Sequence, residues 1–382
     1  MLSLTRTWIL VVLIVPLLLS IAAYLLPYAL RERDDRYYLP PTRTAQELHE
    51  LGACAGKTRV QLSNPTLERL GLLEADITST TGGTSKLPTG NVELSYITTR
   101  CNQKNQNEDT TSNEETLHQN KEHVLLIHGT GISSMVFTKN VGDDNNDDDA
   151  PILWDLFRNK GYDVTAVDFR GHGLSEITTG PYTIELIAAD LASFVRDVFP
   201  GTKFHCYGLS IGFGSCMAMA VYDADLVQTV SGNGFLFDRT NYDMAAYVFS
   251  REPIVRMLGM SLIAQIGQIV MKISQPNLLP KWMRHTHMDG YVHTASGWLE
   301  FDLTWALPNN MTVPTLYLLP EYDQDIGHTR VLVDREIQMM PAGVGEVIEF
   351  PGHSHCMLGE KGGAQKMAEA VLAFFERCDA GS

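Results

Sequence analysis

The chain lacks an excess of basic charge. Its 382 residues include 29 lysines and arginines against 45 aspartates and glutamates, which gives a formal net charge of −16. A nucleic-acid-binding protein needs a basic surface to neutralise phosphates, so this composition excludes nucleic acid as an expected partner. Only 19% of the residues are charged and 44% are hydrophobic, which is enough apolar material for one large or two modest α/β domains.

Cysteine pairs with metal-ligand spacing are also missing. None of the six cysteines forms a C-x-x-C pair, the spacing typical of zinc sites, so we expect no metal centre. Cys206 and Cys216 lie in apolar stretches and are expected to be buried in the core. Cys54 and Cys101 are able to form a disulfide in an oxidising compartment, and the sequence leaves their state open.

Charged side chains are absent from residues 8–30, WILVVLIVPLLLSIAAYLLPYAL. About 20 apolar residues span a bilayer, whereas the apolar core of a cleaved signal peptide has about 7–15 residues. We therefore expect residues 1–36 to be a single-pass membrane anchor with its flank, in the endoplasmic reticulum or another endomembrane. The alternative is secretion after cleavage near residues 20–23, SIAA.

The signals for the side of the membrane disagree. Arg31, Arg33 and Arg36 follow the apolar run, and an excess of positive charge favours the cytosol for the part of the chain after it. A glycosylation sequon at Asn310 favours the opposite side. The sequence therefore leaves the topology open.

After the apolar run, differences in composition divide the chain into a juxtamembrane segment and one α/β domain. Residues 37–90 predict a juxtamembrane segment and linker, with a short helix near 44–53 and a Thr/Gly/Ser-rich end. Residues 91–382 predict one α/β domain. Two insertions within it, near 101–122 and 139–150, are too polar to bury a core and predict disordered surface loops.

Short apolar strands alternate with amphipathic helices in this domain. Strands are expected at 91–100, 123–129, 163–169, 203–208, 226–232, 314–319 and 346–350, with helices at 152–160, 183–199, 212–221, 331–339 and 364–377. This alternation predicts a mostly parallel sheet with helices on both faces. Residues 237–305 do not follow this strand–helix alternation, and their helical apolar runs predict a helical cap. Its apolar run 253–273 is expected to be a packed cap helix, because Arg256 and Lys272 interrupt it.

The motif GLSIG, residues 208–212, lies between a predicted strand and a predicted helix. In such a turn small neighbours let a serine adopt a strained backbone conformation, and its hydroxyl projects from the carboxyl edge of the sheet. Ser210 is therefore the candidate nucleophile. The alternative is a glycine-rich turn that contains a serine by chance.

A serine nucleophile needs a base, and the base needs an acid that orients it. The segment FPGHSHCMLGE follows the last predicted strand and offers His353, with His355 as the rival. The segment LLPEYDQDIG follows the preceding strand and offers Glu321, Asp323 and Asp325, of which we choose Asp323 over Asp325. For the oxyanion that forms on attack, we expect backbone N–H groups as donors.

Together these motifs resemble the α/β-hydrolase fold superfamily, in particular lipase- and esterase-like serine hydrolases with a helical cap. The matching segments are LLIHGTG at 125–131, VDFRGHGLS at 167–175, GLSIG, LLPEYD and PGHSH. The resemblance implies an eight-stranded, mostly parallel sheet and the order Ser210, Asp323, His353 for the catalytic residues. It makes His353, directly after glycine, the expected base, and it makes the N–H groups of Ile211 and Thr130 the expected oxyanion donors.

The resemblance also has consequences outside the triad. It implies that Arg170 and His172 form a structural turn without a catalytic role. Pro320 stands where the family usually has glycine before the acid loop. We expect an ester hydrolase without cofactor or metal, acting on small esters or lipid esters of the acylglycerol type. The alternatives are an acyltransferase or thioesterase with the same triad, and a non-catalytic binding protein of this fold. The oligomeric state is left open.

Overall fold

A computed structural model describes residues 45–70, 90–101, 121–138, 152–235, 250–298 and 301–380. The membrane anchor expected in residues 8–30 lies outside these ranges, as do the insertion at 139–150 and nearly all of the one at 101–122. The predictions for those segments therefore stay predictions.

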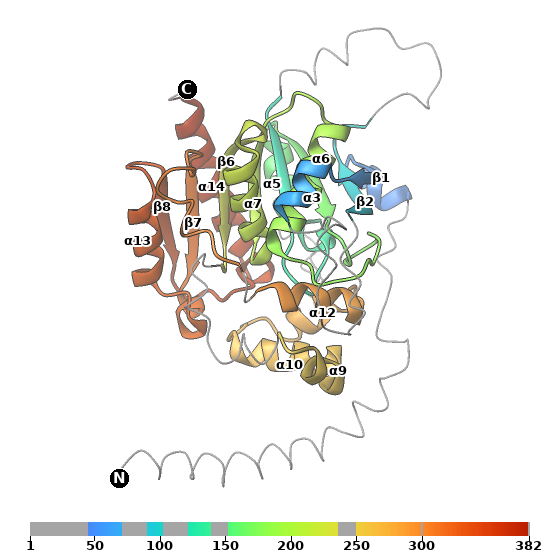
Figure 1. Ribbon diagram of the computed structural model, residues 1–382. Helices are drawn as coiled ribbons and strands as arrows, with labels where there is room; N and C mark the ends of the chain where they lie inside the picture. Colours follow the sequence, from blue (N-terminus) through green and yellow to red (C-terminus); the bar gives the residue numbers. More distant parts are fainter. Residues whose placement is uncertain are drawn as a thin grey trace.

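One sheet of eight strands forms the centre of the molecule (Figure 1). The strands are β1 (Cys54–Gln61), β2 (Asn91–Thr98), β3 (His123–Ile127), β4 (Asp163–Asp168), β5 (Phe204–Leu209), β6 (Val227–Asn233), β7 (Thr315–Pro320) and β8 (Gly345–Phe350). Their order is β1-β2-β4-β3-β5-β6-β7-β8. The β1–β2 and β2–β4 pairs are antiparallel, and the other pairs are parallel. This confirms the expected mostly parallel sheet.

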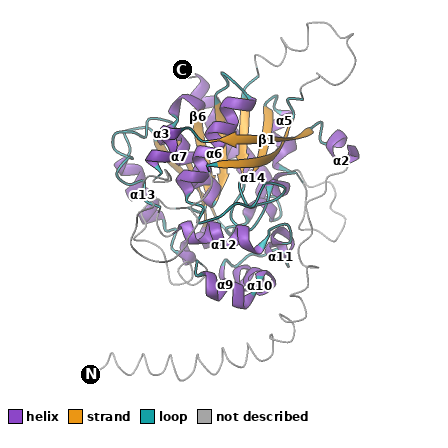
Figure 2. Ribbon diagram, turned by 45° about the vertical axis from the view of Figure 1, so that its right-hand side comes forward, coloured by secondary structure: helices purple, strands orange, loops and turns teal. Residues whose placement is uncertain are grey.

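Helices cover both faces of the sheet, as the alternating pattern predicts (Figure 2). The described α-helices outside the cap are α2 (Ala45–Glu50), α3 (Asn64–Arg69), α5 (Leu153–Asn159), α6 (Ile184–Val198), α7 (Ile211–Tyr222), α13 (Arg330–Met339) and α14 (Gly363–Ala380). Phe194 of α6 and Phe213 of α7 are buried in the core of one face. Trp154 of α5 and Phe375 of α14 are buried in the core of the other. β3, β4 and β5 are buried along their whole length between these layers, and their sequences are rich in apolar residues.

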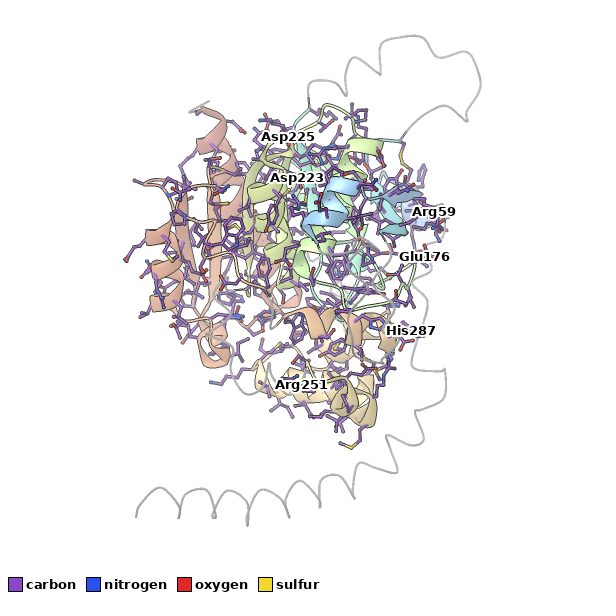
Figure 3. All side chains as sticks on the ribbon, in the orientation of Figure 1. Arg59, Glu176, Asp223, Asp225, Arg251 and His287 are labelled. Atoms are coloured by element: carbon purple, nitrogen blue, oxygen red, sulfur yellow. A yellow bond between two sulfur atoms is a disulfide. The ribbon has the colours of Figure 1, made fainter. Side chains whose placement is uncertain are left out.

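The edge strand β1 was not expected, since its residues fall in the predicted juxtamembrane segment. It pairs along its full length with β2, so the sheet begins well before the expected domain boundary at residue 91. Its side chains alternate between inside and outside, but only Val60 is fully buried. Arg59 on its outer side lies 3.1 Å from Glu176 (Figure 3). A strand with small and charged residues gives little hydrophobic signal. Cys54 at its start forms a disulfide with Cys101, with their Cα atoms 5.7 Å apart.

The cap consists of α9 (Glu252–Leu258), α10 (Met260–Val270), α11 (Leu278–Met283) and α12 (Met288–Gly297), which lie together beyond one edge of the sheet (Figures 1 and 2). The single helix expected at 253–273 is broken at Gly259, whose φ of 79° ends α9, and α9 and α10 meet at 101°. Within the described residues no single helix is long and apolar enough to cross a bilayer, and only this bent pair meets the length and hydropathy test, when its two helices are taken together.

Candidate active site

Ser210 connects the end of β5 to the start of α7. Its backbone has φ 55° and ψ −123°, a conformation that L-residues rarely adopt. The two flanking glycines permit this turn. A Cβ at Gly208 would lie 2.2 Å from a backbone nitrogen, and one at Gly212 would lie 2.2 Å from the carbonyl oxygen of Ile127. The sequence G-x-S-x-G therefore meets a steric requirement at both glycines.

The loop after β3 lies directly beside this turn. A Cβ at Gly129 would be 3.3 Å from the Cβ of Ser210. Thr130 follows, and its hydroxyl accepts a hydrogen bond of 3.0 Å from Nε1 of Trp298 at the end of the cap helix α12. Ile211 is the first residue of α7, where backbone N–H groups have no partner within the helix. The loop that contains Thr130 thus lies beside the turn from Ser210 to Ile211.

Two buried histidines hold the loop after β3. Nε2 of His172 accepts from the N–H of Gly131 (3.1 Å), so its proton must be on Nδ1, which faces a backbone carbonyl 3.2 Å away. Nε2 of His128 accepts from the N–H of Phe169 (3.3 Å), and its Nδ1 donates to the carbonyl of Gly129 (2.8 Å). Burial lowers the pKa of both rings to about 3, so both are neutral and keep these tautomers.

Arg170 in the same turn binds to the helix layer. Its guanidinium group donates to both carboxylate oxygens of Asp190 on α6, at 2.5 and 2.6 Å, and both side chains are fully buried. A bidentate buried pair of this kind fixes the turn after β4 against α6. The geometry is that of a structural contact, as the sequence resemblance implies for this residue.

Asp323 contacts His355, which corrects the expected pairing with His353. Asp323 lies in the short helix η7 (Glu321–Ile326) directly after β7, and its side chain is fully buried. Nδ1 of His355 lies 3.1 Å from its Oδ1 and 3.2 Å from its Oδ2. His355 lies on the loop after β8. Nothing is described for the side chain of Asp325, the alternative acid.

His353 points to a different partner. Its Nδ1 lies 3.1 Å from Oε2 of Glu360, and its Nε2 lies 3.0 Å from Nζ of Lys366. The preceding Gly352 has φ 75°, so the chain turns sharply there. The residue directly after the turn therefore faces α14, and His355, two residues later, faces the carboxyl edge of the sheet. A motif match based on the glycine does not contain this information.

His355 lies over the strand end that neighbours Ser210. A Cβ on Gly234 would lie 2.1 Å from Cε1 of His355, so the imidazole packs directly against this glycine. Gly234 follows β6 as Ser210 follows β5, and the last residues of the two strands, Leu209 and Asn233, are paired. Neighbouring strands lie about 4.8 Å apart. The imidazole is thus held beside the turn that carries Ser210.

Asn233 is a site residue that the sequence analysis missed. Its carbonyl accepts from the N–H of Ser210 (2.7 Å), and its side-chain Nδ2 donates to the carbonyl of His355 (3.1 Å). It therefore connects the Ser210 turn with the His355 loop. The only signal in the sequence is a polar residue between two glycines at a strand end, SGNG, which is typical of ligand-binding edges in α/β proteins.

The charges around Asp323 favour its ionised form. Burial alone would raise the pKa of Asp323, but His355 and His328 outweigh burial and lower the pKa to about 2. Nδ1 of His328 lies 3.7 Å from Oδ2 of Asp323, which is close enough for a charge interaction but too far for a hydrogen bond. Burial lowers the pKa of His355, and the carboxylate of Asp323 more than compensates and raises it.

Two groups of described side chains have the atoms that a metal ion would need within 4.8 Å of one another. One is Asp323, His328 and His355, in which Asp323 contacts His355 as described above and Nδ1 of His328 is buried without a hydrogen bond. The other is Glu122, His205 and Asp379, at the opposite ends of the strands from Ser210. There the amide of Gln228 donates to both carboxylates, and His205 bonds to Glu122, so a hydrogen-bond network accounts for the second group.

Residues 124–369 match the family model described as "Alpha/beta hydrolase family", and the chain therefore belongs to this family. No curated protein sequence matches the chain significantly. The membership confirms the resemblance drawn from the motifs, and it agrees with the order of the strands and with the serine turn between β5 and α7.

Solved structures share this architecture at low sequence identity. An esterase from Thermogutta terrifontis is 20% identical, with 85% of this chain and 99% of the esterase covered and a TM-score of 0.57. An enol-lactonase from Burkholderia xenovorans LB400 is 21% identical, with 75% and 97% covered and a TM-score of 0.55. A membrane phospholipase A, described as a bacterial virulence factor, is 14% identical, with 98% and 99% covered and a TM-score of 0.53. At these identities the likeness shows the fold alone.

Proposed function

We propose that the protein is a serine hydrolase that cleaves carboxylic esters, with Ser210 as nucleophile, His355 as base and Asp323 as the acid that orients the base. The observation that carries the proposal is the buried Asp323–His355 pair, held against Gly234 beside the strained turn of Ser210. An acid, a base and a serine that meet at the carboxyl edge of one sheet are what acyl transfer requires.

In the first half of the reaction, Oγ of Ser210 attacks the ester carbonyl carbon while Nε2 of His355 takes its proton. The N–H groups of Ile211 and Thr130 stabilise the negative charge on the carbonyl oxygen, and one such donor accelerates related reactions about 10²–10³-fold. Asp323 accepts from Nδ1 of the imidazolium ring and stabilises its charge. His355 then gives the proton to the leaving alkoxide, and the acyl group remains on Ser210.

In the second half, water takes the place of the alcohol. His355 removes a proton from this water, the hydroxide attacks the acyl carbon, and a second tetrahedral intermediate forms at the same donors. Its collapse releases the carboxylic acid and returns the proton to Ser210. The scheme uses only side chains and backbone groups of this chain and needs neither metal nor cofactor.

We further propose lipid esters of the acylglycerol type as substrates and membrane attachment through residues 8–30. The apolar cap supports the substrate class. A Cβ on Gly131, next to the oxyanion loop, would lie 3.0 Å from Met283 and 3.1 Å from Tyr291, so apolar cap residues lie directly over this loop. The uncharged run near the N-terminus supports membrane attachment, and the likeness to a membrane phospholipase A supports lipid esters as substrates.

The test uses the full chain in detergent micelles. A fluorophosphonate probe is expected to label the wild type and not the S210A variant, and the wild type is expected to hydrolyse esters in a panel of short p-nitrophenyl esters and acylglycerols. Absence of labelling in a protein with a cooperative thermal unfolding transition would refute the nucleophile and favour a non-catalytic binding protein. If the probe labels the protein and the acyl group is transferred to added alcohol in preference to water, the protein is an acyltransferase. If the protein hydrolyses thioesters in preference to esters, it is a thioesterase.

A further inference from the structure

A buried carboxylate that the proposed reaction does not use lies behind the His355 loop. Glu360 follows the short helix η8 (Met357–Gly359), and only 6% of its surface is exposed. Its two oxygens accept five hydrogen bonds, which come from Ser274, His353 and Ser354. A carboxylate has about four lone-pair sites, so the acceptor capacity of this group is fully used.

Three of these bonds come from the loop that carries His355. Oε2 accepts from the N–H of Ser354 and from Nδ1 of His353, both at 3.1 Å, and Oε1 accepts from Oγ of Ser354 at 2.7 Å. Both donor residues immediately precede His355. Their position against Glu360 therefore sets where the chain enters His355 and how its imidazole faces Asp323.

The other two bonds come from the cap. The N–H and the Oγ of Ser274, in the connection between α10 and α11, donate to Oε1 of Glu360 at 3.1 and 3.0 Å. Ser274 and His355 are far apart in sequence, and they meet through this one carboxylate. A displacement of the α10–α11 connection would remove two of its donors.

The protonation states around Glu360 follow from its partners. Nζ of Lys366 donates to Nε2 of His353, so the ring proton of His353 is on Nδ1 and points to Glu360. Burial would raise the pKa of Glu360, but the hydrogen bonds from Ser354 and Ser274 outweigh burial and lower the pKa. The group is therefore ionised at neutral pH, the form in which both oxygens act only as acceptors.

We infer that Glu360 is a positioning residue that aligns His355 with Asp323 and links this alignment to the position of the cap. This inference rests on the proposed ester hydrolysis and adds a role for the cap. When the cap is seated, Ser274 completes the set of donors and the His355 loop is fixed. When the α10–α11 connection moves away, Glu360 holds the loop less firmly, and the base loses its alignment. Glu360 itself touches no reacting atom.

The first test compares E360Q with a matched control, E369Q, at an exposed glutamate on α14 that accepts a hydrogen bond from the nearby Gln365. In E360Q an NH₂ group faces donors of the His355 loop, so the loop shifts. We expect kcat for a short p-nitrophenyl ester to fall about 10–100-fold with little change in KM, as for an ångström-scale misplacement. In the pH profile of kcat/KM the acid limb should move to lower pH. The shifted loop weakens the contact of His355 with Asp323, and this contact raises the pKa of His355. E369Q should match the wild type in kcat and in the pH of the acid limb.

The second test isolates the cap with S274A, which removes one donor from an exposed residue and leaves the loop contacts of Glu360 intact. We expect a smaller fall in kcat, about 2–10-fold, and the same direction of change in the acid limb. If E360Q is too unstable to measure, S354A replaces it, since this change removes one loop hydroxyl and keeps the carboxylate.

The outcomes separate three cases. If E360Q or S354A unfolds at a lower temperature but keeps the wild-type kcat and acid limb per folded molecule, Glu360 has only a structural role and the inference is wrong. If these variants behave as expected and S274A is identical to the wild type, the link to the cap is wrong. If S210A retains hydrolysis, the proposed function fails, and this result is independent of Glu360.

Discussion

Nδ1 of His355 lies 3.1 Å from Oδ1 of Asp323, and His353, two residues earlier, contacts Glu360 and Lys366 instead. Both histidines follow the same strand, and both are nearly buried. The difference between them is the direction in which the chain turns after Gly352. This geometry makes a direct comparison of the two residues informative.

Replacing His355 should be far more harmful than replacing His353. We expect H355A to lower kcat about 10⁴-fold or more, because it removes the base. H353A leaves the Asp323–His355 contact in place and should lower kcat by no more than about 100-fold, through the Glu360 contact alone. Steady-state kinetics with a p-nitrophenyl ester, with thermal unfolding as a control for folding, decide the matter. A greater loss in H353A would overturn the assignment of the base.

Asp323 should control the pH dependence. His355 acts as a base only when it is neutral, so kcat/KM rises with pH through the pKa of His355, which Asp323 raises above the ordinary value of about 6.5. In D323N the raising influence is gone and burial alone acts, so the acid limb should move to lower pH while kcat falls about 10⁴-fold. An unchanged acid limb in D323N would show that this carboxylate does not act on the base.

Asp323 should also contribute to acid stability. Its pKa is about 2 in the folded protein against 3.8 ordinarily, so its stabilising contribution is complete above pH 3.8 and is lost as the pH falls toward 2. The contribution is on the order of 2 kcal/mol. Urea unfolding of wild type and D323N should therefore differ most above about pH 4 and converge near pH 2. A constant difference over this range would contradict the low pKa.

Gly212, at the start of α7, should not tolerate the methyl group of an alanine. In G212A the added Cβ would lie 2.2 Å from the backbone oxygen of Ile127, so β3 or α7 must move. We expect a loss of unfolding free energy of about 3 kcal/mol or more, or failure to fold. The matched control is G343A. A Cβ at Gly343 meets nothing within 4 Å, so only its φ of 82° opposes the change, at about 1–2 kcal/mol.

The disulfide between Cys54 and Cys101 should stabilise the edge of the sheet. It connects positions 47 residues apart, and closing a loop of this size contributes about 2–4 kcal/mol. Chemical unfolding of C54S/C101S should show this loss. Peptide mass analysis of the chain from its native host, before and after reduction, should find the two cysteines joined. Free thiols at both positions would place the domain in a reducing compartment, where disulfides are rare.

The sequence predicted seven of the eight strands, because buried strands such as β3 are rich in apolar residues and β2 alternates between apolar and polar residues. It missed β1, where Lys57 and Arg59 lie outside and only Val60 is fully buried. It predicted one helix at 253–273, because periodicity does not report that Gly259 adopts a positive φ. In each case the missing information is the backbone conformation of a few residues or the identity of a neighbouring strand.

The same limit applies to the site. Ser210 could be located because it directly follows a strand, and the segment after β7 limited the acid to three carboxylates, of which Asp323 was chosen. The histidine could not be located, since the spacing to β8 permits either candidate and the turn at Gly352 decides. Asn233 and Glu360 were missed because their roles consist of contacts with residues distant in sequence. A hydrogen-bond donor at a strand end or an acid near a loop has no periodic signature.

The hydrogen bonds of Asn233 have one further consequence, which concerns how changes in the loops affect the spacing of Ser210 and His355. Both the Ser210 turn and the His355 loop are hydrogen-bonded to this single residue at the end of β6. The spacing between the two side chains therefore depends on the pairing of β5 with β6 and on the contacts of Glu360 with the His355 loop. A redesigned cap that keeps the contact between Ser274 and Glu360 should therefore change what reaches the serine without changing the distance between the serine and the histidine. Loop grafting is thus the natural route to new substrate preferences in this protein.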